Sequence, residues 1–337
     1  MEANEMINTG QIPGLDRPVS RIFFGTANPP VSTDEYAAAG LFDRILSCGV
    51  NAFDCARSYG RAENALGKWM GSRGNREQVT VLSKCGDIRD GFVLVNRSVI
   101  TEQLHQSLDA LRTDHIDIYL LHRDDPNTPV EEYIDTLNEF QNSGKIRVFG
   151  VSNWTHQRIE TANRYAASHG LNGFSVSSPN YGLARQLEDP FGGGCVTLSG
   201  PENADARDWY IRNQMPVISY SSLGRGFFSG RFKSFDYESA RRVLDIYAQK
   251  GCLYEENMQR LQRAEILAEK YGSSVSEIAM RYVFSSPMNV YAVVNTTSAE
   301  RMKMNLRASV HPLSPEDINY LETGNRFPEP NSYSFEK

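Results

Sequence analysis

The sequence predicts an α/β fold, a closed (β/α)8 TIM barrel with two long loop insertions, and three observations indicate it. Short apolar segments rich in β-branched residues alternate with helical apolar patterns along the chain, as in folds whose parallel strands are covered on both faces. The chain has 337 residues, a length typical of one such barrel with insertions. Polar residues stand at the ends of several apolar segments, where parallel barrels carry their functional side chains.

Eight of these segments are predicted strands. They are residues 21–25, 50–54, 79–84, 116–121, 147–151, 174–177, 216–220 and 290–294. Eight strand–helix units in this length favour a closed barrel over an open, doubly wound sheet. The sequence contains no internal repeat, low-complexity tract or linker. We therefore expect one domain over residues 1–337, with its core at about 20–324.

Helices are predicted between the strands, where apolar residues recur with helical spacing. The recurring residues are Ala62, Ala65, Leu66 and Trp69; Ile100, Leu104, Leu108 and Leu111; Val130, Tyr133, Ile134 and Leu137; and Ile159, Ala162 and Ala166. Gly144 is the predicted stop of the third helix. We interpret all four stripes as faces that pack on the barrel.

Two long segments interrupt this alternation and are predicted to be loop insertions. Residues 184–203 contain three consecutive glycines and two prolines. Residues 223–256 contain Phe227, Phe228, Phe232, Phe235 and Tyr237. Long loops in a compact domain are usually lids or binding loops, and plain surface decoration is the alternative.

Composition and charge disfavour several classes of partner. A net charge of −6 argues against nucleic acid and anionic membranes, and no apolar run approaches the roughly 20 residues that span a bilayer. Residues 1–20 lack the apolar segment of a signal peptide. The five cysteines form no C-x-x-C pair, which fits a reducing compartment. We expect a cytoplasmic protein, with Cys55 and Cys85 as packing thiols.

Four residues of complementary chemistry stand at or just beyond the ends of predicted strands: Asp54, Tyr59, Lys84 and His122. An ammonium beside a phenol lowers the phenol's pKa from its ordinary value of about 10, and a carboxylate keeps that ammonium charged. An imidazole can hydrogen-bond a carbonyl oxygen. Together these groups suit proton donation to a developing alkoxide, which is half of a carbonyl reduction. The hydride must come from a cofactor.

The sequence disfavours the hydrolytic chemistries that barrels also carry. The six histidines form no H-x-H or H-x-x-x-H pair, so no metal site is expected. No G-x-S-x-G segment is present, so a serine nucleophile on a strand-to-helix turn is not expected.

Three segments resemble the aldo-keto reductase family in its bacterial-type form. They are FDCARSYG at 53–60 followed by ENALG at 63–67, LDALRTDHID at 108–117 extending to His122, and GKIR at 144–147 extending to Asn153. The resemblance covers about residues 20–324. It implies a (β/α)8 barrel, NAD(P)H as hydride donor, and reduction of an aldehyde or ketone. It also implies Tyr59 as general acid, with Asp54, Lys84 and His122 in support.

The resemblance also implies contacts to the nicotinamide end of the cofactor. Ser152 and Asn153 match the pair that hydrogen-bonds the carboxamide, and Tyr220 matches the aromatic ring on which the nicotinamide stacks. Ser178 stands where a glutamine commonly assists the carboxamide. We expect that contact to be lost or mediated by water.

Further matched positions extend to the phosphates and the adenosine. Ser221, Leu223 and Arg225 match the loop along the pyrophosphate, and Arg301 and Asn305 match residues at the adenosine end. Arginine suits forked recognition of phosphate.

The adenosine end departs from the family pattern in two places. Asn295 stands where a basic residue often faces the 2′-phosphate, and Met304 stands where a carboxylate often pairs with the adenine amine. Thr296, Thr297 and Ser298 can still hydrogen-bond a phosphate. Ser298 is also a predicted N-cap of a helix whose N-terminus attracts phosphate. We expect NADP(H) as cofactor, leave NAD(H) open, and expect looser binding than in tight NADPH-dependent members.

The predicted partner is a small-molecule carbonyl substrate, and its identity stays open among aldehydes, ketones, quinones and sugars. Asn28, Pro29 and Trp154 or its neighbours are predicted pocket residues, and aromatic linings suit all of these substrates. Arg123, Asp124 and Asp125 would allow a polar substrate, although a turn is the preferred interpretation of the two aspartates. A cofactor-binding regulatory subunit with little turnover is the alternative function. The sequence does not predict an oligomeric state.

Overall fold

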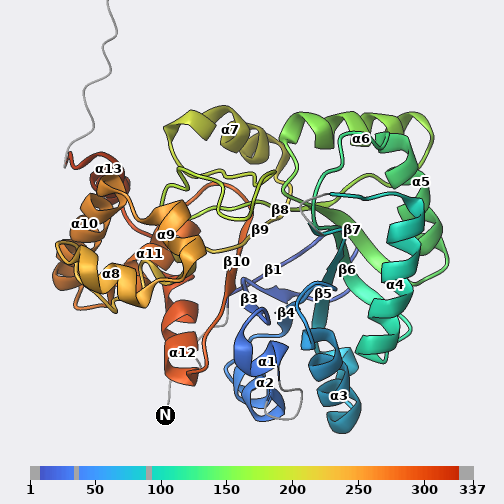
Figure 1. Ribbon diagram of the computed structural model, residues 1–337, viewed down its shortest axis with the longest axis horizontal. Helices are drawn as coiled ribbons and strands as arrows, with labels where there is room; N and C mark the ends of the chain where they lie inside the picture. The colour runs from blue at the N-terminus through green and yellow to red at the C-terminus, as the bar shows by residue number, and fades with distance from the viewer. Residues whose placement is uncertain (1–7, 34–37, 89–92, 326–337) are drawn as a thin grey trace, which may run out of the picture.

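The computed structural model describes residues 8–33, 38–88 and 93–325. At its centre is a closed barrel of eight parallel strands, in the order β10-β3-β4-β5-β6-β7-β8-β9 (Figure 1). The strands are β3 (Ile22–Gly25), β4 (Ala52–Asp54), β5 (Thr80–Cys85), β6 (Ile116–Leu121), β7 (Ile146–Ser152), β8 (Val176–Ser178), β9 (Val217–Ser219) and β10 (Val290–Val294). All eight predicted strands are confirmed, with ends that differ by at most one or two residues.

A short antiparallel hairpin covers the amino-terminal end of the barrel. Its strands, β1 (Thr9–Gly10) and β2 (Val19–Ser20), pair with each other. Ile12 and Leu15 of the hairpin pack in one cluster with Phe23 and Tyr291, which fill the barrel interior. The hairpin was not predicted, because a two-residue strand is too short to show an alternation of apolar and polar side chains.

Helices surround the barrel (Figure 1). Those that alternate with the strands are α2 (Ala38–Ser47), α3 (Ala62–Arg73), α4 (Arg97–Leu111), α5 (Val130–Asn142), α6 (His156–Ser168), α7 (Ala204–Asn213), α11 (Val275–Phe284) and α12 (Ala299–Ala308). Further helices include α1 (Pro29–Ser32), α10 (Glu255–Tyr271) and α13 (Pro315–Thr323). The four predicted apolar stripes lie on α3 to α6, and every residue in them is buried. Within the described ranges, no helix is long and apolar enough to cross a membrane.

Aromatic packing fixes the strand that carries Asp54. Phe53 of β4 meets Phe42 of α2 and Trp69 of α3 at ring-centroid distances of 5.6 and 5.2 Å. All three rings are almost completely buried. Side chains alternate across a strand, so the burial of Phe53 in the outer layer turns its neighbour Asp54 toward the barrel axis.

The two insertions lie together at the carboxyl-terminal side of the barrel. The first is mostly irregular, and the Asp189 carboxylate organises it by accepting hydrogen bonds from the Phe191 and Cys195 amides. The second, predicted as a loop, also contains two short helices, α8 (Tyr237–Val243) and α9 (Ile246–Cys252). Asp236 and Asp245 cap their N-termini.

The aromatic residues of the second insertion divide between core and surface. Phe227, Phe228 and Phe232 are buried in the main hydrophobic core, whereas Phe235 is 82% exposed. Most of the predicted aromatic set therefore anchors the insertion to the barrel.

Candidate active site

The four predicted catalytic side chains come together at the carboxyl-terminal mouth of the barrel. Asp54 ends β4, Lys84 lies near the end of β5, His122 directly follows β6, and Tyr59 lies on the turn after β4. The Lys84 Nζ forms an ion pair with Asp54 and donates to the Cys55 carbonyl at 2.9 Å. It lies 3.4 Å from the Tyr59 hydroxyl oxygen. The rings of Tyr59 and His122 meet edge-on at 5.8 Å.

The turn that carries Tyr59 is held by backbone and side-chain contacts. The Arg57 amide donates to the Lys84 carbonyl at 2.9 Å. Gly60 has a φ of 59°, and a β-carbon there would lie 2.8 Å from the Ser32 carbonyl oxygen, so only glycine fits without strain. The buried Glu63 carboxylate binds Arg57 and accepts from the Ser83 hydroxyl at 2.6 Å. Glu63 was not predicted to have a role in the site, yet its carboxylate links the turn of Tyr59 to the strand of Lys84.

Burial dominates the electrostatics of the phenol. It raises the pKa of Tyr59 to about 12, although the Lys84 ammonium opposes this shift. The lowering effect of the ammonium was predicted, but the net direction is upward because the phenol has lost its water. For Lys84, burial is the largest single effect and lowers the pKa, but the charge and hydrogen bond of Asp54, together with Tyr59, make the net shift upward. The pair therefore keeps a charged ammonium beside a protonated phenol.

His122 is a neutral imidazole at ordinary pH. Burial lowers its pKa to about 3, and the nearby Asp87 carboxylate only partly opposes this shift. Its Nδ1 is buried without a hydrogen-bond partner and lies 3.5 Å from an Asp87 oxygen.

The Cys55 and Cys85 thiols lie away from this cluster. Both are buried in the main hydrophobic core between strands and helices, and burial raises both thiol pKa values, that of Cys85 to about 12. Their predicted role as packing thiols is confirmed. Among the described residues, no group of three or more His, Cys, Asp or Glu side chains could hold a metal ion.

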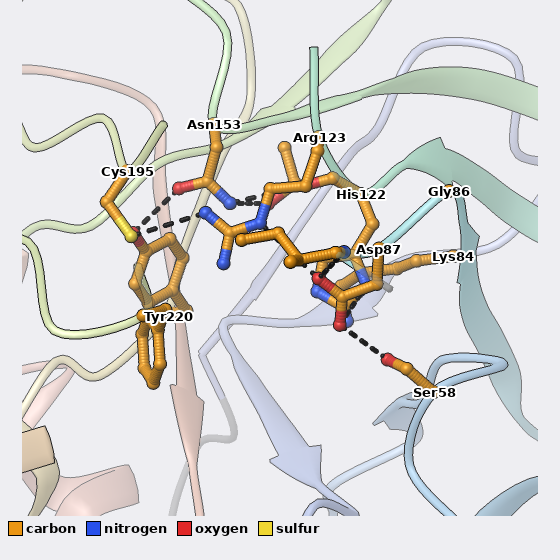
Figure 2. A network of polar contacts seen from close by, with 12 residues as sticks. Ser58, Lys84, Gly86, Asp87, His122, Arg123, Asn153, Cys195 and Tyr220 are labelled. Atoms are coloured by element: carbon orange, nitrogen blue, oxygen red, sulfur yellow. Dashed lines mark hydrogen bonds and ion pairs between the residues drawn. The ribbon is translucent and has the colours of Figure 1, made fainter. Parts of the chain in front are cut away.

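A second polar network, which the sequence did not predict, adjoins the four residues (Figure 2). Asp87 accepts from the Ser58 hydroxyl at 2.8 Å and lies 3.4 Å from the Arg123 Nε. The Arg123 Nη1 lies 3.3 Å from the Cys195 sulfur. The sequence feature that could have indicated this network is that Asp87 and Arg123 each lie just after a strand that leads to a catalytic candidate.

The predicted nicotinamide contacts form one hydrogen-bonded group at the ends of β7, β8 and β9. The Asn153 amide donates to the Ser152 hydroxyl and to the His122 carbonyl at 3.1 and 3.2 Å, and its oxygen accepts from the Tyr220 hydroxyl at 2.7 Å. The Ser178 hydroxyl donates to the Ile218 carbonyl at 2.7 Å. The Ser178 hydroxyl proton is therefore already engaged in a hydrogen bond within the barrel wall.

The predicted pyrophosphate loop lines a groove between the two insertions. Ser221 and Arg225 line it together with Phe191 and Tyr247, and Leu223 is partly buried against the core. The Arg225 guanidinium pairs with Asp245 at 2.6 Å and lies 5.3 Å from the centres of both aromatic rings. Arg225 thus joins the first insertion to the second.

The predicted adenosine contacts lie after β10, at the start of α12. Ser298 is the N-cap of α12, as predicted, and accepts from the Arg301 amide at 3.3 Å. The Arg301 Nε donates to the Thr296 hydroxyl at 3.2 Å. Asn295 accepts from the Asn28 amide at 3.0 Å. Asn305, on the same helix, is buried.

Two of the predicted substrate-pocket residues have structural contacts instead. Trp154 is 1% exposed and packs edge-on against Tyr133 and Phe174. Asn28 is the N-cap of α1 and binds Asn295. Trp154 follows the end of β7 in sequence. Its large apolar ring packs between the helices, against Tyr133 and Phe174, and not in the polar mouth of the barrel.

The family described as "Aldo/keto reductase family" matches residues 21–325. The chain belongs to this family. Similar curated proteins include the Emericella nidulans aldo-keto reductase ausK, 28% identical over 87% of this chain and 73% of that protein. Aldo-keto reductase YhdN of Bacillus subtilis is 30% identical over 76% of this chain and 73% of that protein.

The wider comparisons agree on the fold and on oxidoreductase relatives. A putative aryl-alcohol dehydrogenase of Saccharomyces cerevisiae, AAD14, is 28% identical over 87% of this chain and 77% of that protein. Among solved structures, a thermostable aldo-keto reductase, Tm1743, in complex with the inhibitor epalrestat, superposes with a TM-score of 0.70 at 20% identity, over 94% of this chain and 99% of that one. The family supports carbonyl reduction in general, and its (β/α)8 barrel is the fold of this chain. Its relatives here are bacterial and fungal, so they do not single out the bacterial type.

Proposed function

We propose that this chain is an NAD(P)H-dependent reductase that converts an aldehyde or ketone to the alcohol, with Tyr59 as general acid. The observation that carries the proposal is the position of Lys84, whose Nζ pairs with Asp54 and lies 3.4 Å from the Tyr59 hydroxyl oxygen. His122 meets the Tyr59 ring edge-on. A carbonyl oxygen between the phenol and the imidazole would therefore have two hydrogen-bonding partners.

Proton transfer follows from these positions. When bound, the cofactor supplies a hydride to the carbonyl carbon. As the carbon–oxygen double bond becomes single, the oxygen gains negative charge and takes the hydroxyl proton of Tyr59. The Lys84 ammonium stabilises the phenolate that remains, and Asp54 keeps the ammonium charged. The phenolate then regains a proton from solvent.

The polar residues around the mouth fit a dinucleotide. The Tyr220 ring is the proposed stacking surface for the nicotinamide, and Ser152 and Asn153 are the proposed carboxamide contacts. Ser178 can take part only as an acceptor, because its proton is donated to a backbone carbonyl. Ser221 and Arg225 are the proposed pyrophosphate contacts, because an arginine guanidinium suits phosphate.

The start of α12 suits the adenosine end. A capped helix N-terminus and the adjacent Arg301 both favour an anion, and Thr296, Ser298 and Asn305 are the proposed neutral contacts. We propose NADP(H) as the preferred cofactor and NAD(H) as the weaker one, because Arg301 can pair with a 2′-phosphate. Asn295 supplies no charge there.

Replacing Arg301 with Ala should weaken NADPH binding by about 10- to 100-fold, since a charged hydrogen bond contributes about 1.5–3 kcal/mol. The turnover rate at saturating cofactor should be close to that of the wild type. Fluorescence titration with NADPH and NADH measures the effect. Arg307→Ala, an exposed arginine on the same helix, is the matched control and should bind as the wild type does. Equal affinities for Arg301→Ala and the control would contradict the assignment.

The pH dependence of reduction should be flat across the neutral range. The pKa of Tyr59 is raised to about 12, so the phenol holds its proton at every pH well below that value. We expect the single-turnover rate of reduction to stay constant from about pH 6 to about pH 9. A decline in this rate centred near neutral pH, if absent in Tyr59→Phe, would show that the phenol loses its proton at a much lower pH and would contradict the prediction.

Steady-state oxidation of NADPH and NADH with a panel of aldehydes and ketones tests the proposal as a whole. Turnover that saturates with the carbonyl compound supports the reductase. Tight cofactor binding without turnover on any carbonyl would instead support the regulatory subunit.

A further inference from the structure

A charged pair outside the four catalytic candidates borders the place of the reacting carbonyl. Asp87 follows β5, and Arg123 follows β6 directly after His122. The Asp87 side chain is 27% exposed, whereas that of Arg123 is 6% exposed. The carboxylate lies 3.5 Å from the His122 Nδ1, so the pair is one side chain away from the Tyr59–His122 contact.

Contacts on several sides hold the pair in place. Ser58, on the turn that carries Tyr59, donates to one Asp87 oxygen at 2.8 Å, and the Ile88 amide donates to the other at 2.9 Å. The Arg123 Nη1 lies against the Cys195 sulfur, and the guanidinium lies 5.9 Å from the centre of the Phe191 ring. Figure 2 shows the second terminal nitrogen of Arg123 directed into the space between Tyr220 and Asp87.

The pair offers an acceptor and a donor but no net charge. A substrate carboxylate or phosphate would be attracted by Arg123 and repelled by Asp87, which is 3.4 Å from the Arg123 Nε. A plain alkyl or aryl group would displace water from both charged side chains without replacing the lost hydrogen bonds, which costs binding free energy. A hydroxyl group can donate to the carboxylate and accept from the guanidinium at the same time.

We propose that Asp87 and Arg123 bind a hydroxyl group next to the carbonyl carbon, so that the substrate is a neutral hydroxy-aldehyde or hydroxy-ketone. The inference rests on the proposed reductase function and names its substrate class. A site built to hydrogen-bond a substrate hydroxyl discriminates strongly against the analogue that lacks it, because its own polar groups are then left unpaired.

The test compares two aldehydes that differ by one hydroxyl group, 2-hydroxypropanal and propanal, with NADPH as cofactor. The wild-type protein should show a kcat/KM for free 2-hydroxypropanal at least about 10-fold above that for propanal. A third aldehyde, 4-oxobutanoate, carries a carboxylate and should show no such advantage over propanal. This comparison needs no variant, so it stands even if a variant fails to fold.

Asp87→Asn should lower the ratio of the two kcat/KM values by about 10- to 100-fold. Both values can fall, because Asp87 also lies beside His122, but a purely structural role would leave their ratio unchanged. Asp43→Asn is the matched control: Asp43 pairs with Arg73 at 2.8 Å on the outer helices, and the ratio should not move.

The outcomes separate this inference from the function on which it rests. A wild-type ratio near one, a preference for 4-oxobutanoate, or an unchanged ratio in Asp87→Asn would each overturn the hydroxyl site while leaving the reductase in place. Failure of the folded wild-type protein to turn over any aldehyde with either cofactor would overturn both.

Discussion

Tyr59→Phe should lower the rate of carbonyl reduction by about 10²- to 10⁴-fold, the usual contribution of a positioned general acid. The change removes one oxygen atom and keeps the ring that packs against Lys84 and His122. Only the transition state needs the proton, so cofactor affinity and the free energy of unfolding should stay close to wild-type values. Single-turnover reduction at saturating NADPH measures the loss directly.

A second phenol provides the control for this variant. Tyr165 on α6 donates to Asp135 at 3.1 Å, outside the mouth of the barrel, and Tyr165→Phe should reduce carbonyls at the wild-type rate. If Tyr59→Phe kept most of its activity, Tyr59 would not be the acid, whatever its neighbours.

Lys84→Met should be severe in two measurable ways. Loss of the ammonium removes the stabilisation of the developing phenolate, which we expect to cost on the order of 10²- to 10³-fold in turnover. It also leaves the buried Asp54 carboxylate without its partner, and breaking a buried ion pair costs about 3–5 kcal/mol of stability. Denaturant unfolding and single-turnover kinetics report the two effects separately.

The double variant Lys84→Met/Asp54→Asn separates folding from catalysis. Removing the orphaned charge should restore much of the free energy of unfolding, while the turnover rate should stay low because the ammonium is still missing. Lys270→Met, which breaks the surface ion pair with Asp317, should change neither quantity by much. Recovery of turnover in the double variant would show that Lys84 has only a structural role.

The barrel could be predicted from the sequence because its strands are covered on both faces. Buried strands read as short apolar runs, and the helices between them, such as α3 with Ala65, Leu66 and Trp69, show a clear apolar stripe. The hairpin β1–β2 and the helices α8 and α9 were not predicted. Two-residue strands and seven-residue helices are too short to show a periodic pattern of apolar residues. Local capping residues such as Asp245 determine where these short helices begin.

The candidate site was predictable only as far as strand ends determine position. Asp54, Lys84 and His122 follow from the rule that parallel strands end at one mouth. Asp87 and Cys195 did not, because their place depends on the path of irregular loops. The net pKa shift of Tyr59 also could not be read from sequence, since it depends on how completely packing removes water from the phenol.

The most direct test of the central claim is the fate of the hydride and the proton in one turnover. The protein would be supplied with an aldehyde that it turns over and with NADPH carrying deuterium at both C4 positions, and the alcohol would be analysed by mass spectrometry. We predict one deuterium on the carbinol carbon for each cofactor oxidised, with formation of this product slowed by orders of magnitude in Tyr59→Phe. Alcohol without deuterium, or labelled alcohol formed equally fast by the variant, would contradict the mechanism.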